Sequence, residues 1–141
     1  MWNECKDLQE YIVGLRRDLH QIPELGLHLP ETAAYVTTEL DKIGIPYICS
    51  KKDSGIIATI KGGKPGKHTV LLRGDIDALP ITENPGKSYC SLNPGVMHAC
   101  GHDCHTSMLL GAAKILSAHR DEIHGTVKLI FQMAEEIPKN M

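Results

Sequence analysis

Short apolar runs of strand character alternate along the chain with longer segments in which apolar residues recur every three to four positions, the spacing of an amphipathic helix. The expected strands are residues 47–50, 55–60, 69–72 and 125–133, and the expected helices are residues 4–20, 30–43 and 102–118. This alternation predicts an α/β fold in which helices flank a mostly parallel sheet. In such sheets the polar residues just beyond the carboxyl ends of the strands form the site.

Composition is that of an ordinary globular protein and excludes several kinds of partner. The 141 residues carry a net charge of −2 with both signs interspersed, so we expect no nucleic-acid partner. The longest apolar runs fall far short of the roughly 20 residues that cross a bilayer. We therefore expect no membrane partner. Charges also occupy the N-terminal stretch where a signal peptide is apolar, so we do not expect secretion. Five scattered cysteines suit a reducing compartment, and the cytoplasm is the expected location.

Two aspartates follow the strand expected at residues 69–72. Asp75 and Asp77 are two positions apart, so in an extended chain both side chains project to the same side and can face one crevice. They could bind a metal or orient a ligand; the alternative is turn and helix-cap chemistry, where aspartate is also favoured. Residues 82–97 then combine prolines, glycines and asparagines, which predicts a long irregular loop of the kind that is usually functional.

The densest group of metal-ligating side chains lies in residues 96–106, VMHACGHDCHT. Cys100 and His102 are separated by Gly101, over which the backbone can curl to bring sulfur and imidazole to one cation. Thiolate, imidazole and carboxylate together favour a transition metal, although a buried cysteine beside a helix-capping histidine is the alternative. Asp103 could orient a ligand histidine from outside the ligand set. The weaker candidates in this stretch are His98, Cys104 and His105.

Two glutamates come directly after the last expected strand. Neighbouring residues on a strand point to opposite faces, so Glu135 and Glu136 meet one site only if the strand has already ended. One carboxylate could then bind a metal while the other holds a water molecule. The alternative is an exposed acidic strand end, which fits less well after so apolar a strand.

Together these groups predict a metal-dependent hydrolase. The ligand types suit Zn²⁺, Mn²⁺, Co²⁺ or Ni²⁺, and the number of carboxylates favours a pair of ions. A bound metal lowers the pKa of water to about 7, and a nearby glutamate removes and relays the proton. The same metal polarises a carbonyl group, which gives hydrolysis of an amide.

Three segments, in this order, resemble one known family. They are RGDIDALPI, MHACGHD followed by CHTSMLLGAAKIL, and GTVKLIFQMAEE. They resemble the N-acyl-amino-acid amidohydrolase branch, with its hippurate hydrolases, of the aminoacylase/carboxypeptidase G metallopeptidases. With LRRDLHQIPELG, the resemblance covers nearly the whole chain. It implies a small-molecule N-acyl-amino acid substrate, a di-metal α/β catalytic domain interrupted by a dimerisation domain, and full-length relatives that form homo-oligomers.

The residue patterns and the resemblance together give individual residues expected roles. The expected catalytic residues are Glu135 and Asp77, the expected metal ligands are Cys100, His102 and Glu136, and the expected near-site residues are Asp75 and Asp103. By position, Cys100 resembles the ligand that bridges two metal ions, and Glu135 resembles the general base. Asp75 stands where related peptidases carry a ligand histidine, which leaves its own ligation open.

The family takes two further histidine ligands and the dimerisation domain from sequence beyond the part that this chain resembles. We therefore expect residues 1–141 to be the N-terminal portion of the catalytic domain, truncated before the dimerisation domain. The alternative to an active hydrolase is a non-catalytic fragment that binds metal or a partner.

Overall fold

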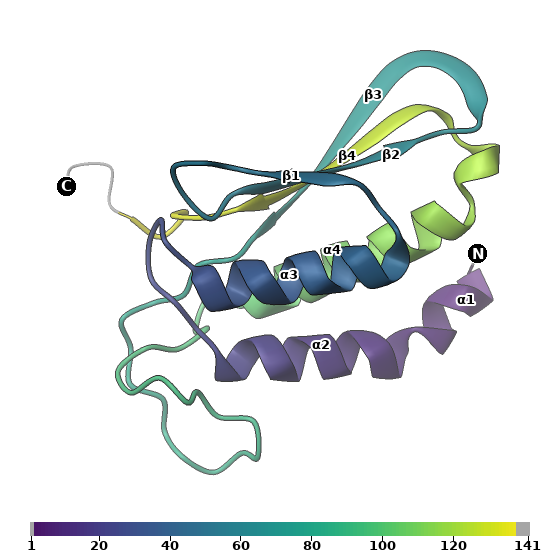
Figure 1. Cartoon of the computed structure of the whole chain (residues 1–141). Helices are drawn as coiled ribbons and strands as arrows, with labels where there is room; N and C mark the ends of the chain where they lie inside the picture. Colours follow the sequence, from purple (N-terminus) through teal and green to yellow (C-terminus); the bar gives the residue numbers. More distant parts are fainter. Residues whose placement is uncertain (1, 138–141) are drawn as a thin grey trace.

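Helices cover one face of a four-stranded sheet in residues 2–137, the part of the chain that the computed structural model describes (Figure 1). The helices are α1 (Trp2–Asp7), α2 (Gln9–Gln21), α3 (Pro30–Ile43), α4 (His102–Ala118) and a short 3₁₀ helix, η1 (Arg120–Glu122). The strands are β1 (Tyr47–Cys49), β2 (Ile56–Lys61), β3 (Lys64–Asp75) and β4 (His124–Gln132). The domain expected at residues 1–141 also includes residue 1 and residues 138–141, which lie outside the described residues.

The sheet is mixed rather than mostly parallel, although the expected α/β class is confirmed. β1 pairs antiparallel with β2 and β2 pairs antiparallel with β4, whereas β3 and β4 run parallel. The connections explain the difference. Residues 50–55 between β1 and β2 are too few for a helical crossover, so these strands form a hairpin, while α4 lies in the crossover from β3 to β4.

The start of β4 lies between β2 and β3, although these two strands follow each other along the chain. In the short link between β2 and β3, the N–H of Gly62 donates to the carbonyl oxygen of Gly125 at 2.8 Å. A Cβ at Gly62 would lie 2.2 Å from the carbonyl oxygen of Ile123. Gly125 has a φ of 87°, and its Cβ would lie 2.3 Å from the carbonyl oxygen of His68. Backbones pass so closely here that only glycine fits.

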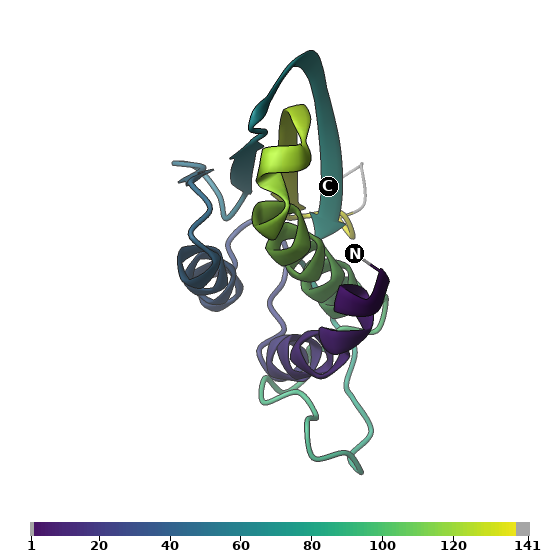
Figure 2. The same ribbon diagram turned by 90° about the vertical axis from the view of Figure 1, so that its right-hand side faces the viewer.

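The core lies between the sheet and helices α3 and α4, and α2 packs on α4 from the side away from the sheet (Figure 2). In β4, Val127, Leu129 and Phe131 are buried and alternate with more exposed residues, as the sequence pattern predicts. The helix expected over residues 102–118 is confirmed, but the one expected over residues 4–20 is two helices separated at Leu8. Among the described residues, no helix combines the length and apolarity needed to cross a membrane.

Between β3 and α4, residues 76–101 contain no helix or strand of the sheet, apart from one isolated bridge. This loop runs past the C-terminal end of α2 (Figure 1), where the N–H of Leu92 donates to the carbonyl oxygen of Gln21 at 2.9 Å. The irregular loop expected at residues 82–97 is therefore confirmed. Its two ends join the segments that carry the expected site residues.

Candidate metal centre

His102 is the first residue of α4, and its side chain is buried, with 2% of its surface exposed. Its Nδ1 lies 2.8 Å from the carbonyl oxygen of Asp77 and 3.2 Å from Asp77 Oδ1. Because a carbonyl oxygen can only accept, Nδ1 carries the proton and donates it. In the neutral ring, the other nitrogen, Nε2, then carries the lone pair with which histidine binds a metal ion.

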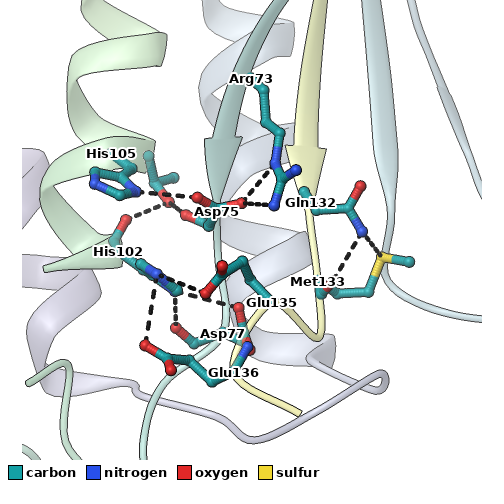
Figure 3. Close-up of polar contacts among 10 residues, drawn as sticks. Arg73, Asp75, Asp77, His102, His105, Gln132, Met133, Glu135 and Glu136 are labelled. Carbon is teal, nitrogen blue, oxygen red and sulfur yellow. Dashed lines mark hydrogen bonds and ion pairs between the residues drawn. The ribbon is translucent and has the colours of Figure 1, made fainter. Parts of the chain in front are cut away.

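Glu135 and Glu136 reach the same ring nitrogen from the end of β4 (Figure 3). The strand ends at Gln132, and Ala134 then adopts a φ of 58°, a left-handed conformation that turns the chain. Glu135 Oε2 lies 3.7 Å and Glu136 Oε1 lies 3.8 Å from His102 Nε2. Both carboxylates can face one site because the strand has ended before them.

Cys100 brings a thiol to the same place. Its sulfur, a ring nitrogen of His102 and a carboxylate oxygen of Glu136 all lie within 4.8 Å of one another. Gly101, with a φ of 87°, makes the bend between Cys100 and His102 in a conformation that favours glycine. A hydrogen bond to Glu136, partial loss of hydration and the charge of nearby carboxylates raise the pKa of the Cys100 thiol to about 11.

These ligand atoms fit a divalent cation. In the neutral ring, the lone pair of His102 Nε2 would face two carboxylates, so that three acceptor groups would lie together. Glu136 Oε1 is buried and has no hydrogen-bond partner among the described residues. Leaving a buried polar atom unpaired costs about 1–3 kcal/mol, and a cation would satisfy the facing atoms together. Sulfur, nitrogen and oxygen in one site are the donor set of zinc and its neighbours.

Asp75, the last residue of β3, borders this group of ligand atoms. Its carboxylate pairs with Arg73 at 2.8 Å and lies 3.2 Å from His105 Nδ1 (Figure 3). One ligand atom from each of Asp75, His102 and His105 also lie within 4.8 Å of one another. Asp75 therefore has neighbours that could share a cation with it, and its own ligation of a metal stays a prediction.

Asp77 contacts two of the expected ligands at once. Its main-chain and side-chain oxygens lie against His102 Nδ1, and its Oδ2 accepts the N–H of Glu136 at 2.9 Å. Asp77 itself is buried, with 1% of its surface exposed. The sequence predicts Asp77 as a catalytic residue. Its contacts fit a positioning role, because they fix the ring of His102 and the backbone of Glu136.

Asp103 contacts α2 rather than His102, contrary to the expectation that it orients a ligand histidine. Its fully buried carboxylate lies 2.6 Å from His20 Nδ1 and 2.9 Å from Arg16 Nε. The helix explains the difference, because adjacent residues of an α-helix point about 100° apart. With His102 directed to the end of the sheet, Asp103 must point elsewhere.

Sequence reasoning missed His20 and Arg16, the partners of Asp103. His20 and Asp103 are 83 positions apart, and only the packing of α2 on α4 brings them together. The only available signal is the segment LRRDLHQIPELG, which contains both residues and resembles the family without indicating a role. His98, a weaker candidate, is buried with neither ring nitrogen hydrogen-bonded among the described residues, and its burial lowers its pKa to about 4.

Comparison with known proteins finds one peptidase family and several amino acid hydrolases that resemble this chain. The sequence model of peptidase family M20/M25/M40 matches residues 71–141. IAA-amino acid hydrolase ILR1-like 5 of Arabidopsis thaliana is 49% identical over 131 residues, which are 93% of this chain and 30% of that protein. The N-acyl-L-amino acid amidohydrolase of Geobacillus stearothermophilus is 44% identical over 126 residues, which are 89% of this chain and 34% of that protein.

A solved structure supports the same relationship. The YXEP protein of Bacillus subtilis, described as a dinuclear metal binding peptidase from the M20 family, superposes with a TM-score of 0.87 at 42% identity. The match covers 94% of this chain and 37% of that one. This chain thus spans about a third of the length of the relatives that it matches.

Proposed function

The chain belongs to peptidase family M20/M25/M40, and we propose that it carries the metal site of an amidohydrolase that cleaves the amide bond of N-acyl-amino acids. The observation that carries the proposal is the convergence of Cys100 Sγ, a ring nitrogen of His102 and a carboxylate oxygen of Glu136, with Glu135 beside them. The substrate class rests on the names of the relatives, an IAA-amino acid hydrolase and an N-acyl-L-amino acid amidohydrolase.

Cys100, His102 and Glu136 would hold a divalent cation, and the mixed donor set suits Zn²⁺, Mn²⁺, Co²⁺ or Ni²⁺. A second ion is part of the proposal, because further carboxylates border the group and a similar structure is described as dinuclear. When bound, such ions polarise the carbonyl of the substrate and lower the pKa of water to about 7. Asp77 would keep His102 in the tautomer that leaves Nε2 free.

Glu135 would act as the general base. Its side chain is 42% exposed, whereas that of Glu136 is 22% exposed, so Glu135 is the more accessible to substrate and water. Its carboxylate would take a proton from the attacking water and return it to the nitrogen of the leaving amine. One glutamate would therefore move the proton while its neighbour binds the cation.

The alternative is a metal- or partner-binding piece without catalytic activity. The observation that favours it is the length of the chain, about a third of that of its relatives. In this case the chain would bind a cation through Cys100, His102 and Glu136 but would not turn over substrate.

The test is an assay of the 141-residue chain with Mn²⁺ or Zn²⁺ and N-acetyl or N-benzoyl amino acids, with free amine as the readout. We expect Glu135→Gln to lower turnover at least about 100-fold, the usual minimum for loss of a general base, while metal binding persists. The matched control is Glu122→Gln, at an exposed carboxylate on η1, which should leave turnover unchanged. Metal binding without turnover in the unmodified chain would support the alternative.

A further inference from the structure

His20 lies at the centre of a buried group of charged side chains next to the metal centre. It is in the last turn of α2, with 1% of its surface exposed. Its Nδ1 lies 2.6 Å from Asp103 Oδ2, and its Nε2 lies 3.0 Å from Glu83 Oε1. The side chains of Asp103 and Glu83 are 0% and 7% exposed. One imidazole therefore joins α2, α4 and the loop between β3 and α4.

Each of the two carboxylates also accepts from a second donor. The N–H of Ser91 donates to Glu83 Oε2 at 2.7 Å, and this hydrogen bond lowers the pKa of Glu83. Arg16 Nε lies 2.9 Å from Asp103 Oδ2. Each ring nitrogen of His20 therefore lies within hydrogen-bond distance of a carboxylate oxygen, and hydrogen bonds to charged groups are about twice as strong as neutral ones.

Both contacts of His20 lead to segments that carry proposed ligands. Asp103 directly follows His102, and its Oδ1 accepts the N–H of Cys104 at 2.9 Å within the first turn of α4. Glu83 belongs to the loop that runs past α2 and continues to Cys100 (Figure 1). His20 thus links the loop that leads to Cys100 with α4, the helix that begins at His102.

We propose that His20 is a positioning residue for the metal centre, which sets the geometry between Cys100 and His102 by holding Glu83 and Asp103 together. The inference rests on the proposed function, because it concerns the same ligands. In the described part of the chain, the hydrogen bonds of the His20 side chain go to Asp103 and Glu83, so it acts through them. Removing a partner that orients ligands typically weakens metal binding about 10- to 100-fold.

The first test uses the 141-residue chain and Co²⁺, whose visible spectrum reports ligand geometry and whose thiolate charge-transfer band reports Cys100. His20→Gln should weaken Co²⁺ binding at least about tenfold and change both absorption features. The matched control is Val36→Ala, at a fully buried core residue of α3, which should lower the unfolding midpoint and leave the affinity and spectrum unchanged. A folded His20→Gln chain with unchanged affinity and spectrum would overturn the proposal.

The second test follows amide hydrogen exchange in the metal-free chain and separates this proposal from the proposed function. His20→Gln should speed exchange in residues 96–104 more than in β2, whereas Val36→Ala should do the reverse. Failure of the unmodified chain to bind Co²⁺ would count against the proposed function alone. The exchange pattern would then decide the role of His20, and unchanged exchange in residues 96–104 would refute it.

Discussion

At the scale of single residues, one proton on Nδ1 of His102 decides whether the ring can bind a cation. The carbonyl oxygen of Asp77, 2.8 Å from Nδ1, accepts that proton, and the carboxylate of the same residue accepts the N–H of Glu136 at 2.9 Å. The main-chain contact survives any substitution at position 77, whereas the side-chain contacts do not. The aspartate side chain therefore acts mainly on the placement of the ligands.

Asp77→Asn should accordingly weaken metal binding without abolishing it. The variant keeps the proton on Nδ1 but loses the charged acceptor for the N–H of Glu136, and we expect about a tenfold loss of Co²⁺ affinity. Titration of the absorption spectrum measures this. Asp41→Asn, at an exposed carboxylate on α3, is the control and should bind Co²⁺ normally. Equal affinity in the two variants would show that the Asp77 side chain does not position the ligands.

The buried ring of His98 should make the stability of the metal-free chain depend on pH. Burial lowers its pKa from 6.5 to about 4, so as the pH falls the unfolded chain takes up the proton first. The contribution of the neutral ring is full above pH 6.5 and is lost as the pH falls toward 4. A shift of this size corresponds to something on the order of 3 kcal/mol of unfolding free energy.

Urea unfolding in the presence of a chelator, followed from pH 6.5 to pH 4, measures this loss. His98→Met, which cannot be protonated, should show a weaker dependence of the unfolding free energy on pH than the unmodified chain. Parallel curves for the two proteins would mean that His98 is charged or solvated in the folded state.

At the scale of elements, the close crossing of β4 between β2 and β3 depends on glycines. Gly125→Ala combines an unfavourable φ of 87° with a Cβ 2.3 Å from the carbonyl oxygen of His68, and we expect a loss of at least about 2 kcal/mol in unfolding free energy. Gly14→Ala, in α2 with nothing within 4 Å of its Cβ, should instead gain about 0.5–1 kcal/mol. Chemical denaturation measures the unfolding free energy of both variants. Effects of the same sign would contradict the close backbone packing at Gly125.

Elements with strong local signals could be predicted from the sequence. The helix over residues 102–118 and the buried alternation of Val127, Leu129 and Phe131 follow from periodicity alone. The order of the strands could not be predicted, because the insertion of β4 between β2 and β3 depends on tertiary packing and not on local sequence. The glycines that permit it read equally well as an ordinary turn.

Some residues of the candidate site could be predicted from the sequence, and others could not. Cys100, His102 and the two glutamates could be selected because their residue types and their places after strands carry chemical information. The link from His20 to Asp103 could not be selected, since it joins positions 83 residues apart and depends on how α2 packs on α4.

At the scale of the whole molecule, cation binding should stabilise the fold, because the proposed ligands come from the loop before α4, from α4 and from the segment after β4. Zn²⁺ at about 100 times its dissociation constant should add about 2.7 kcal/mol to the unfolding free energy. Cys100→Ser should lose most of this gain, whereas Cys49→Ser, at an exposed thiol on β1, should keep it. Thermal unfolding with and without Zn²⁺ makes the comparison, and equal gains in both variants would exclude Cys100 as a ligand.

The most direct measurement is X-ray absorption at the zinc edge of the chain loaded with one equivalent of Zn²⁺. If Cys100, His102 and Glu136 share the ion, the nearest shell contains one sulfur at about 2.3 Å together with nitrogen and oxygen at about 2.0–2.2 Å. The sulfur should disappear in Cys100→Ser. A shell of nitrogen and oxygen alone in the unmodified chain would contradict the metal centre.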